Sequence, residues 1–187
     1  MYAPVAAQLG VDRATAKVAV LGAMYGQTTG HGAQALRRLD AAYPVAMRYL
    51  HDADEAGQVG RAVRTYGGRL IRFGTTNAND VTERDARSRA AAMGRYGRNA
   101  MIQGAAAELF KRWAVTLRAR LAGHGVAAEI VLCLHDELLV HVPVAAADTV
   151  ARLVADCLQE AAAGWAPDGT VRFVADLSVV SRWSDAK

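Results

Sequence analysis

The stretch VLCLHDELLVHVP, residues 131–143, places two carboxylates in the middle of an apolar, strand-like segment. Apolar residues lead up to Asp136 and Glu137 and follow them directly. Burying a carboxylate among such side chains is costly unless a cation or a full set of hydrogen bonds compensates for it. The pattern predicts two short strands within residues 126–142, joined by a turn at His135 and Asp136. It also raises the question of what neutralises the two acids.

The rest of the chain has a mostly helical pattern. Asp12 is a suitable N-cap for a helix from Arg13 to about Tyr25. A second helical segment covers roughly residues 31–55, in which Pro44 should cause a break or a kink. The remaining elements are predicted as a glycine-rich hairpin or loop at 65–80, helices at 82–93, 99–122 and 145–163, and a last strand at 170–180. Together these elements indicate an α+β fold.

Composition limits the classes of protein to which the chain can belong. Its 187 residues are 52% hydrophobic, enough for a core in one or two compact units. No apolar run approaches the roughly 18 residues of a membrane span, and the N-terminus lacks the segments of a secretory signal. Cys133 and Cys157 form no CxxC pair and are interpreted as buried thiols, and the five histidines form no zinc-binding pattern. We therefore expect a cytoplasmic protein without a membrane partner.

Positive charge is concentrated in the middle of the chain. Residues 61–98 contain nine arginines against three acidic residues, and residues 99–120 contain four basic residues against one, which gives +6 and +3. Residues 121–187 contain four basic and nine acidic residues. All but three of the 22 basic residues are arginine, the better bidentate ligand for phosphate. Nucleic acid is the commonest partner of such a segment, although a solvated basic surface has the same pattern.

A second constellation lies in RATAKVAVLGAMYG, residues 13–26, where Arg13, Lys17, Leu21 and Tyr25 recur every four residues. On a helix this spacing places them along one face over about 18 Å. Two cations, an apolar group and a tyrosine in line suit a ligand with phosphates at one end and a flat ring at the other. The alternative interpretation is the solvated basic edge of an amphipathic helix.

Five stretches follow one another in the order of a known family's motifs. They are RATAKVAVLGAMYG at 13–26, TYGGRL at 65–70, RYGRNAMIQGAAAELFK at 95–111, LHDELLVHVP at 134–143 and FVADLSVVSRWSDAK at 173–187. The first resembles motif B of the family A DNA polymerases of the bacterial polymerase I type, and LHDELLVHVP resembles their motif C with its HDE core. The others resemble the turn between the fingers helices, the segment ending in QG-x-AA, and the last palm strand with its terminus.

The resemblance implies an incoming nucleotide at the first of these motifs. Arg13 and Lys17 would hold the phosphates of a deoxynucleoside triphosphate, as charge-assisted donors on a fingers helix that closes. Leu21 would face the sugar, where the family usually has phenylalanine or tyrosine. Tyr25 would lie at the base of the helix, beside the templating base. Lys17 is thereby also a candidate catalytic residue.

The other motifs imply contacts with primer–template DNA and with metal ions. Arg95, Asn99 and Gln103 would contact the minor groove, where every base pair offers an acceptor at an equivalent place; Arg69, in the turn, is a further DNA-binding candidate. The catalytic candidates of the HDE triplet are His135 near the primer terminus, Asp136 as a magnesium ligand, and its neighbour Glu137. Divalent metal ions would then neutralise the two acids on their buried strand turn.

One departure from the family pattern concerns the chemistry. Two-metal phosphoryl transfer uses carboxylates from two palm strands, and the family's first catalytic aspartate lies several tens of residues before the motif B arginine. Only twelve residues precede Arg13, so the expected magnesium site is incomplete in this chain. Asp176, in the predicted last strand, is no evident substitute. The resemblance therefore predicts no activity for these residues alone, with the thumb and a missing N-terminal polymerase segment lying elsewhere.

The resulting expectation is a fingers-like helical region at 1–94 and a C-terminal palm region at 95–187, part of an antiparallel sheet with packed helices. The function implied is template-directed DNA synthesis in replication or repair, by a cytoplasmic, nucleoid-associated protein. A non-catalytic DNA-binding remnant and a subunit of a split polymerase are the alternatives. The HDE triplet and the QG segment argue against a single-subunit RNA polymerase, and a metal-dependent nuclease needs more carboxylates nearby.

Overall fold

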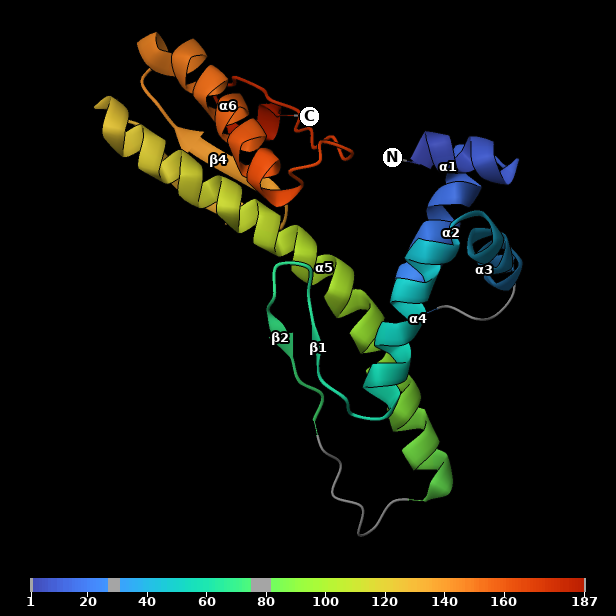
Figure 1. Ribbon diagram of the computed structural model, residues 1–187. Helices are drawn as coiled ribbons and strands as arrows, with labels where there is room; N and C mark the ends of the chain where they lie inside the picture. The colour runs from blue at the N-terminus through green and yellow to red at the C-terminus, as the bar shows by residue number, and fades with distance from the viewer. Residues whose placement is uncertain (1, 27–30, 75–81, 187) are drawn as a thin grey trace. The chain divides into compact units, whose positions relative to one another are not determined.

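The computed structural model of the chain describes residues 2–26, 31–74 and 82–186 (Figure 1). It divides into two compact units, Met1–Ala105 and Ala106–Lys187. The elements in chain order are α1 (Tyr2–Leu9), α2 (Arg13–Tyr25), α3 (His31–Ala42), α4 (Pro44–Gln58), β1 (Val63–Arg64), β2 (Leu70–Ile71), α5 (Glu83–His124), β3 (Glu129–Leu134), β4 (Glu137–His141), the 3₁₀ turn η1 (Val144–Ala146), α6 (Ala147–Trp165) and η2 (Trp183–Asp185). Helices dominate, and the described strands form two antiparallel pairs, which confirms the expected α+β class.

Helix α2 begins and ends where the sequence predicts. The Asp12 carboxylate accepts hydrogen bonds from the backbone N–H and the hydroxyl of Thr15, at 2.9 and 2.7 Å. The hydroxyl bond, and then the backbone bond, lower the pKa of Asp12, so this cap is present above the ordinary carboxyl pKa and is lost as the pH falls through the lowered value. Gly26 ends the helix at φ 68° and donates its N–H to Gly22. Glycine reaches this left-handed conformation without strain.

The first unit is a helical cluster around α2. The side of α2 that carries Ala19 and Ala23 is buried against Leu39 of α3 and Met47 and Leu50 of α4. Small side chains on α2 let the neighbouring backbones come close. The predicted break at Pro44 is confirmed, because α3 ends at Ala42 and α4 starts at Pro44, in the first helical position where its missing N–H costs nothing.

Helix α5 is one continuous helix, whereas the sequence predicted separate helices at 82–93 and 99–122. The prediction was wrong because Gly94 and Gly97 do not interrupt this helix; they let it approach α4. A Cβ added to Gly97 would lie 2.5 Å from the carbonyl oxygen of Ala53, and one on Gly94 would collide with Asp54. The two helices can therefore pack this closely only where α5 has no side chain.

Replacing Gly97 by alanine should lower the free energy of unfolding by about 1–3 kcal/mol, because the added methyl group must displace the α4 backbone. Gly123 lies in the same helix with nothing within 4 Å of an added Cβ. Gly123→Ala is the matched control and should stabilise the chain by about 0.5–1 kcal/mol through helix propensity. Denaturant unfolding followed by circular dichroism measures both changes. Equal effects of the two substitutions would contradict the close contact.

The hairpin β1–β2 confirms the predicted turn at TYGGRL and is fixed to α5 (Figure 1). The Thr65 hydroxyl accepts the backbone N–H of Arg69 at 3.0 Å, and the Thr65 N–H donates to the Arg69 carbonyl at 3.0 Å. Thr65 is buried, and a Cβ on Gly104 of α5 would lie 2.6 Å from its methyl group. After β2, the Phe73 ring meets Tyr96 of α5 edge to face, with 6.0 Å between centroids. Predicted residues 75–80 of this segment lie outside the described part of the chain.

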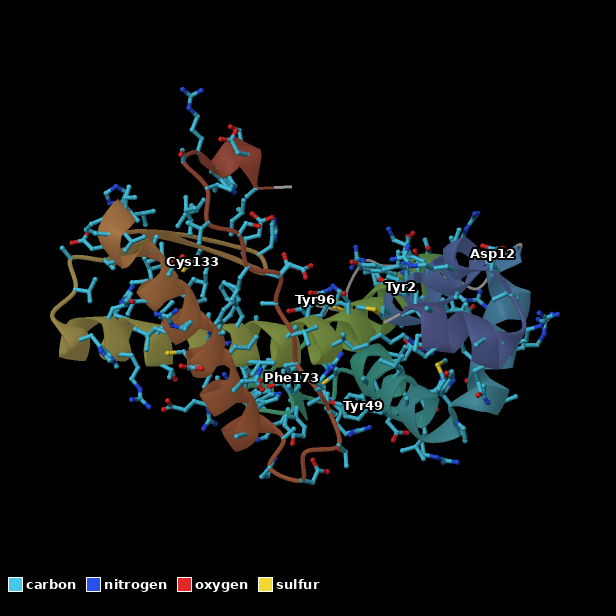
Figure 2. The ribbon with its side chains drawn as sticks, turned by 90° about the horizontal axis from the view of Figure 1, so that it is seen from above. Tyr2, Asp12, Tyr49, Tyr96, Cys133 and Phe173 are labelled. Atoms are coloured by element: carbon cyan, nitrogen blue, oxygen red, sulfur yellow. The ribbon has the colours of Figure 1, made fainter. Side chains whose placement is uncertain are left out.

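The second unit packs α6 and the hairpin β3–β4 against the C-terminal part of α5 (Figure 1). Its core joins Trp113 and Leu117 of α5 to Val154 and Cys157 of α6, and the Trp113 indole N–H donates to the Val154 carbonyl at 3.0 Å. Leu134 pairs with Glu137, which leaves a two-residue turn between the strands as predicted. Phe173, in the segment after α6, also packs on this core (Figure 2).

Two expectations for the second unit were wrong. Residues 170–180 form no strand, because a strand needs a partner for its backbone hydrogen bonds and no described segment pairs with these residues. Cys133 is exposed rather than buried. Residues alternate between the two faces of a strand, so Ile130 packs on the core and Leu132 is half-buried, while Val131 and Cys133 are exposed. Cys157 is buried as expected, and this burial raises the pKa of its thiol.

Candidate functional site

The four residues spaced along α2 lie on its outer face. Arg13 and Lys17 are exposed, Leu21 is half-buried, and the Tyr25 side chain is 47% exposed. The opposite face of α2 is occupied by alanines in the core of the first unit. The helix therefore presents, in order, two cations, an aliphatic side chain and a phenol ring to a ligand approaching from solvent. Arg13 and Lys17 bring two positive charges to the first turns of α2, whose N-terminus is capped by the Asp12 carboxylate.

Arg13 is also oriented by an aromatic neighbour. Its guanidinium carbon lies 5.8 Å from the centroid of the Tyr2 ring, which belongs to α1 and is labelled beside Asp12 in Figure 2. A cation at this distance is attracted by the ring face. The contact restrains the Arg13 side chain. Its positive charge remains available to a ligand, because the Tyr2 ring carries no charge that could neutralise it.

The last turn of α2 meets the first residue of the QG segment. A Cβ added to Gly26 would lie 2.8 Å from Cγ of Arg95 on α5. Arg95 is exposed, so its aliphatic stem covers the end of α2 while the guanidinium remains accessible to solvent. The structure thus brings Arg95 next to Tyr25 and Gly26, although 68 residues lie between Gly26 and Arg95 in the sequence.

Asn99 and Gln103 continue from Arg95 along α5, with different exposures. Gln103 is exposed, while Asn99 is half-buried and its Oδ1 atom is buried without a hydrogen-bond partner among the described residues. An unpaired buried amide oxygen is costly. Gly104 follows Gln103 directly. Because it has no side chain, Thr65 of the hairpin that carries Arg69 can pack closely against it. Arg69 itself is exposed.

The arginines of the basic segment at 61–98 are exposed, with one exception. Eight of the nine arginines at 61–98 are exposed: Arg61, Arg64, Arg69, Arg72, Arg84, Arg87, Arg89 and Arg95. Arg98 is only 5% exposed and cannot contribute to a binding surface for a polyanion. The charge count of the segment included Arg98, and its burial removes one positive charge from that surface.

The HDE triplet forms the tip of the β3–β4 hairpin. His135 has φ 52°, a left-handed conformation that is uncommon outside glycine and in which asparagine, aspartate and histidine are enriched. His135, Asp136 and Glu137 are all exposed. The expectation of buried acids was wrong, because a two-residue turn carries them past the apolar residues that pack on the core. The carboxylates of Asp136 and Glu137 are therefore solvated, and no cation is needed to offset a free-energy cost of burying them.

Asp136 and Glu137 nevertheless have the ligand chemistry that magnesium prefers, which is carboxylate oxygen with room for water and phosphate. Magnesium commonly takes only one or two carboxylates from a protein, so Asp136 fits as one ligand. In the part of the chain that the structure describes, no group of three or more histidine, cysteine, aspartate or glutamate side chains could hold a metal ion.

Arg98 and Thr65 lie within two of the quoted motifs, but the resemblance assigned no role to either. A signal for Arg98 was present, because Gly94, Gly97, Arg98 and Met101 follow the i, i+3, i+4, i+7 spacing of a buried helix face. Gly94, Gly97 and Met101 are buried together with it. Thr65 gave no such signal, since its contact with Gly104 depends on how a hairpin packs on a helix.

Comparisons with known proteins agree with the motifs. The family described as DNA polymerase family A matches residues 6–185. DNA polymerase I of Bacillus caldotenax is 29% identical over 156 residues, 83% of this chain and 16% of that protein. DNA polymerase I of Chloroflexus aurantiacus is 30% identical over 158 residues, 79% of this chain and 16% of that protein. The chain spans about a sixth of the length of these relatives.

A solved structure is similar over much of the same region. The POL domain of Pol1 from M. smegmatis, in complex with DNA primer–template and dNTP, has a TM-score of 0.64 and 26% identity, and the similarity covers 84% of this chain and 30% of that one. None of the described helices is both long and apolar enough to cross a membrane. Because the family match extends over nearly all of its residues, the chain belongs to the family A DNA polymerases.

Proposed function

We propose that these residues form the nucleotide-binding and primer–template-binding part of a DNA polymerase that adds deoxynucleotides to a primer 3′ end. The observation that carries the proposal is the outer face of α2, on which Arg13, Lys17, Leu21 and Tyr25 are accessible in line and end beside Arg95. This order matches a nucleoside triphosphate that lies along the helix, with its phosphates toward Arg13 and its base toward Tyr25. The similar M. smegmatis protein is bound to such a nucleotide and to DNA.

In this proposal the residues of α2 bind and orient the nucleotide. Arg13 and Lys17 donate charge-assisted hydrogen bonds to the phosphate oxygens, and the electrostatic attraction strengthens as charge builds up on the leaving pyrophosphate. Leu21 makes an apolar contact with the sugar but offers neither a ring face nor a hydroxyl. Tyr25 covers the base pair that is being formed.

The DNA contacts come from α5, the β1–β2 hairpin and the HDE turn. The guanidinium of Arg95 and the amide nitrogens of Asn99 and Gln103 donate to minor-groove acceptors in this proposal. Arg69 binds the backbone of the duplex. His135 lies at the primer terminus in this proposal, and Asp136, with Glu137 beside it, is the magnesium ligand.

Bound magnesium would polarise the reacting phosphate and favour the ionised form of the primer hydroxyl. Such an enzyme would serve replication or repair on cytoplasmic, nucleoid DNA. A second candidate, DNA binding without catalysis, as a remnant or as a subunit of a split polymerase, is favoured by one observation: the eight exposed arginines can bind DNA without any carboxylate.

Nucleotide binding tests the proposal most directly. In the presence of primer–template DNA, Lys17→Met should weaken the affinity for the matching deoxynucleoside triphosphate by about 10- to 100-fold, the effect of losing one hydrogen bond from a charged donor. Lys111→Met removes an exposed lysine of α5 and is the matched control. Isothermal titration measures both affinities. If the two variants bind the nucleotide equally well, α2 is not the nucleotide site.

A further inference from the structure

Arg98 is a buried cation with an unusual set of partners. It lies on the face of α5 that packs against α2 and α4, and only 5% of it is exposed. A buried charge is tolerated only when acceptors surround it. Its Nη1 donates to the carbonyl oxygen of Ala23 at 3.1 Å, and its Nη2 donates to Nδ1 of His51 at 2.7 Å. Its Nε lies 3.3 Å from Oδ2 of Asp54 in an ion pair that supplies the opposite charge, although this Nε has no hydrogen-bond partner among the described residues.

The Ala23 carbonyl belongs to the last turn of α2. The last four carbonyls of a helix have no partner within the helix, and Ala23 is one of them because α2 ends at Tyr25. Arg98 therefore caps α2 from another helix, with a positive charge at the end of the dipole that favours cations. Leu21 and Tyr25 lie two residues on either side of Ala23, so the position of this carbonyl sets the position of both.

The partners of Arg98 also determine the tautomer of His51. An arginine can only donate, so Nδ1 of His51 accepts and Nε2 carries the hydrogen, which it donates to Oδ1 of Asp40 at 2.8 Å. The ring therefore links Arg98 of α5 to Asp40 of α3, while Asp54 of α4 pairs with Arg98.

We propose that Arg98 is a positioning residue, which fixes the last turn of α2 and with it Leu21 and Tyr25, and that His51 holds the guanidinium in place for this role. The role in nucleotide binding rests on the proposed function. The fixing of α2 does not, because it follows from contacts among α2, α3, α4 and α5. Loss of the acceptor at Nδ1 of His51 removes one partner of Arg98 and loosens the turn that the guanidinium holds.

Hydrogen–deuterium exchange of the full chain tests the positioning role. Arg98→Met keeps the aliphatic stem and removes all donors, so the amides of residues 20–26 should exchange about tenfold faster, as expected for the loss of a buried hydrogen bond. Arg89→Met, which removes an exposed arginine of the same helix, should leave that segment unchanged. Unchanged exchange in Arg98→Met, with the fold retained, overturns the proposal.

A substitution at His51 provides a second readout that needs no change at Arg98. His51→Phe keeps a flat ring and removes the acceptor of Arg98 at Nδ1, so exchange at 20–26 relative to a peptide of α6 should rise several-fold. His51→Asn places an acceptor near the position of Nδ1 and should keep this ratio close to that of the original sequence. An unchanged ratio in His51→Phe, or an equal rise in His51→Asn, contradicts the role of His51.

Nucleotide affinity separates this proposal from the proposed function. If the original chain binds nucleotide, Arg98→Met should weaken binding about tenfold, and His51→Asn should retain it. If no variant binds nucleotide while exchange at 20–26 responds as expected, the proposed function fails and the positioning of α2 stands. If nucleotide binds and Arg98→Met changes neither affinity nor exchange, the positioning role is excluded.

Discussion

The affinity of the folded chain for primer–template DNA should fall on the order of a thousandfold between about 50 and 200 mM salt. The expected fall follows from counterion release, in which each neutralised phosphate contributes about 0.9 to the logarithmic salt slope, and six phosphates give this magnitude. Eight arginines at 61–98 are exposed, and the six contacts are expected to come from among them. Fluorescence anisotropy with a labelled primer–template, repeated at several salt concentrations, measures the slope.

Charge removal within the surface provides the controls. Arg61→Gln combined with Arg72→Gln removes two exposed charges next to β1 and β2 and should reduce the slope by about two. Arg182→Gln removes an exposed arginine outside the segment and should leave the slope unchanged. A flat salt response would remove the electrostatic basis of DNA binding, and equal slopes in all three proteins would place the contacts elsewhere.

Local signals predicted most of the helix boundaries correctly, because the interactions that set these boundaries are themselves local. Asp12 accepts hydrogen bonds from a residue three positions on, and Pro44 restricts the backbone of its own neighbourhood. The turn between Thr65 and Arg69 also closes on itself. Each of these contacts can be inferred from a few consecutive residues of the sequence.

The errors concern contacts between distant segments. Gly94 and Gly97 were compatible with a helix break, and only the approach of α4 shows that they serve close packing. Residues 170–180 have the composition of a strand, but pairing depends on a second strand that the described residues do not provide. The α2 residues were identified from spacing and resemblance, whereas Arg98 was counted as a surface charge although its partners come from α2 and α4.

The exposure of the HDE turn changes the argument about its chemistry. Asp136 does not need a metal ion to be tolerated where it lies, so its proposed role has to be shown by function rather than inferred from the cost of burial. Two-metal phosphoryl transfer uses carboxylates from two strands. The second of these carboxylates, by resemblance, precedes the α2 motif by several tens of residues.

A polypeptide of these 187 residues alone should therefore show no measurable template-dependent incorporation, with magnesium or with manganese. Adding the preceding palm segment of a relative, covalently or as a separate chain, should produce incorporation. Asp136→Asn should then reduce the rate at least a thousandfold, because losing several kcal/mol of transition-state stabilisation costs a factor of ten for each 1.36 kcal/mol or so. Primer extension on a labelled template measures all three.

The comparison needs a carboxylate that is exposed in the same unit but lies outside the turn. Asp148, in the first turn of α6, meets this requirement. Asp148→Asn should change the rate of incorporation by the complemented protein by no more than about twofold, since surface substitutions away from a functional site have small effects. Robust incorporation by the 187-residue polypeptide alone, lost on Asp136→Asn, would show that its own residues complete the site. Equal rates for Asp136→Asn and Asp148→Asn would show that Asp136 takes no part in the reaction. DNA binding through the exposed arginines would then be the remaining proposed role.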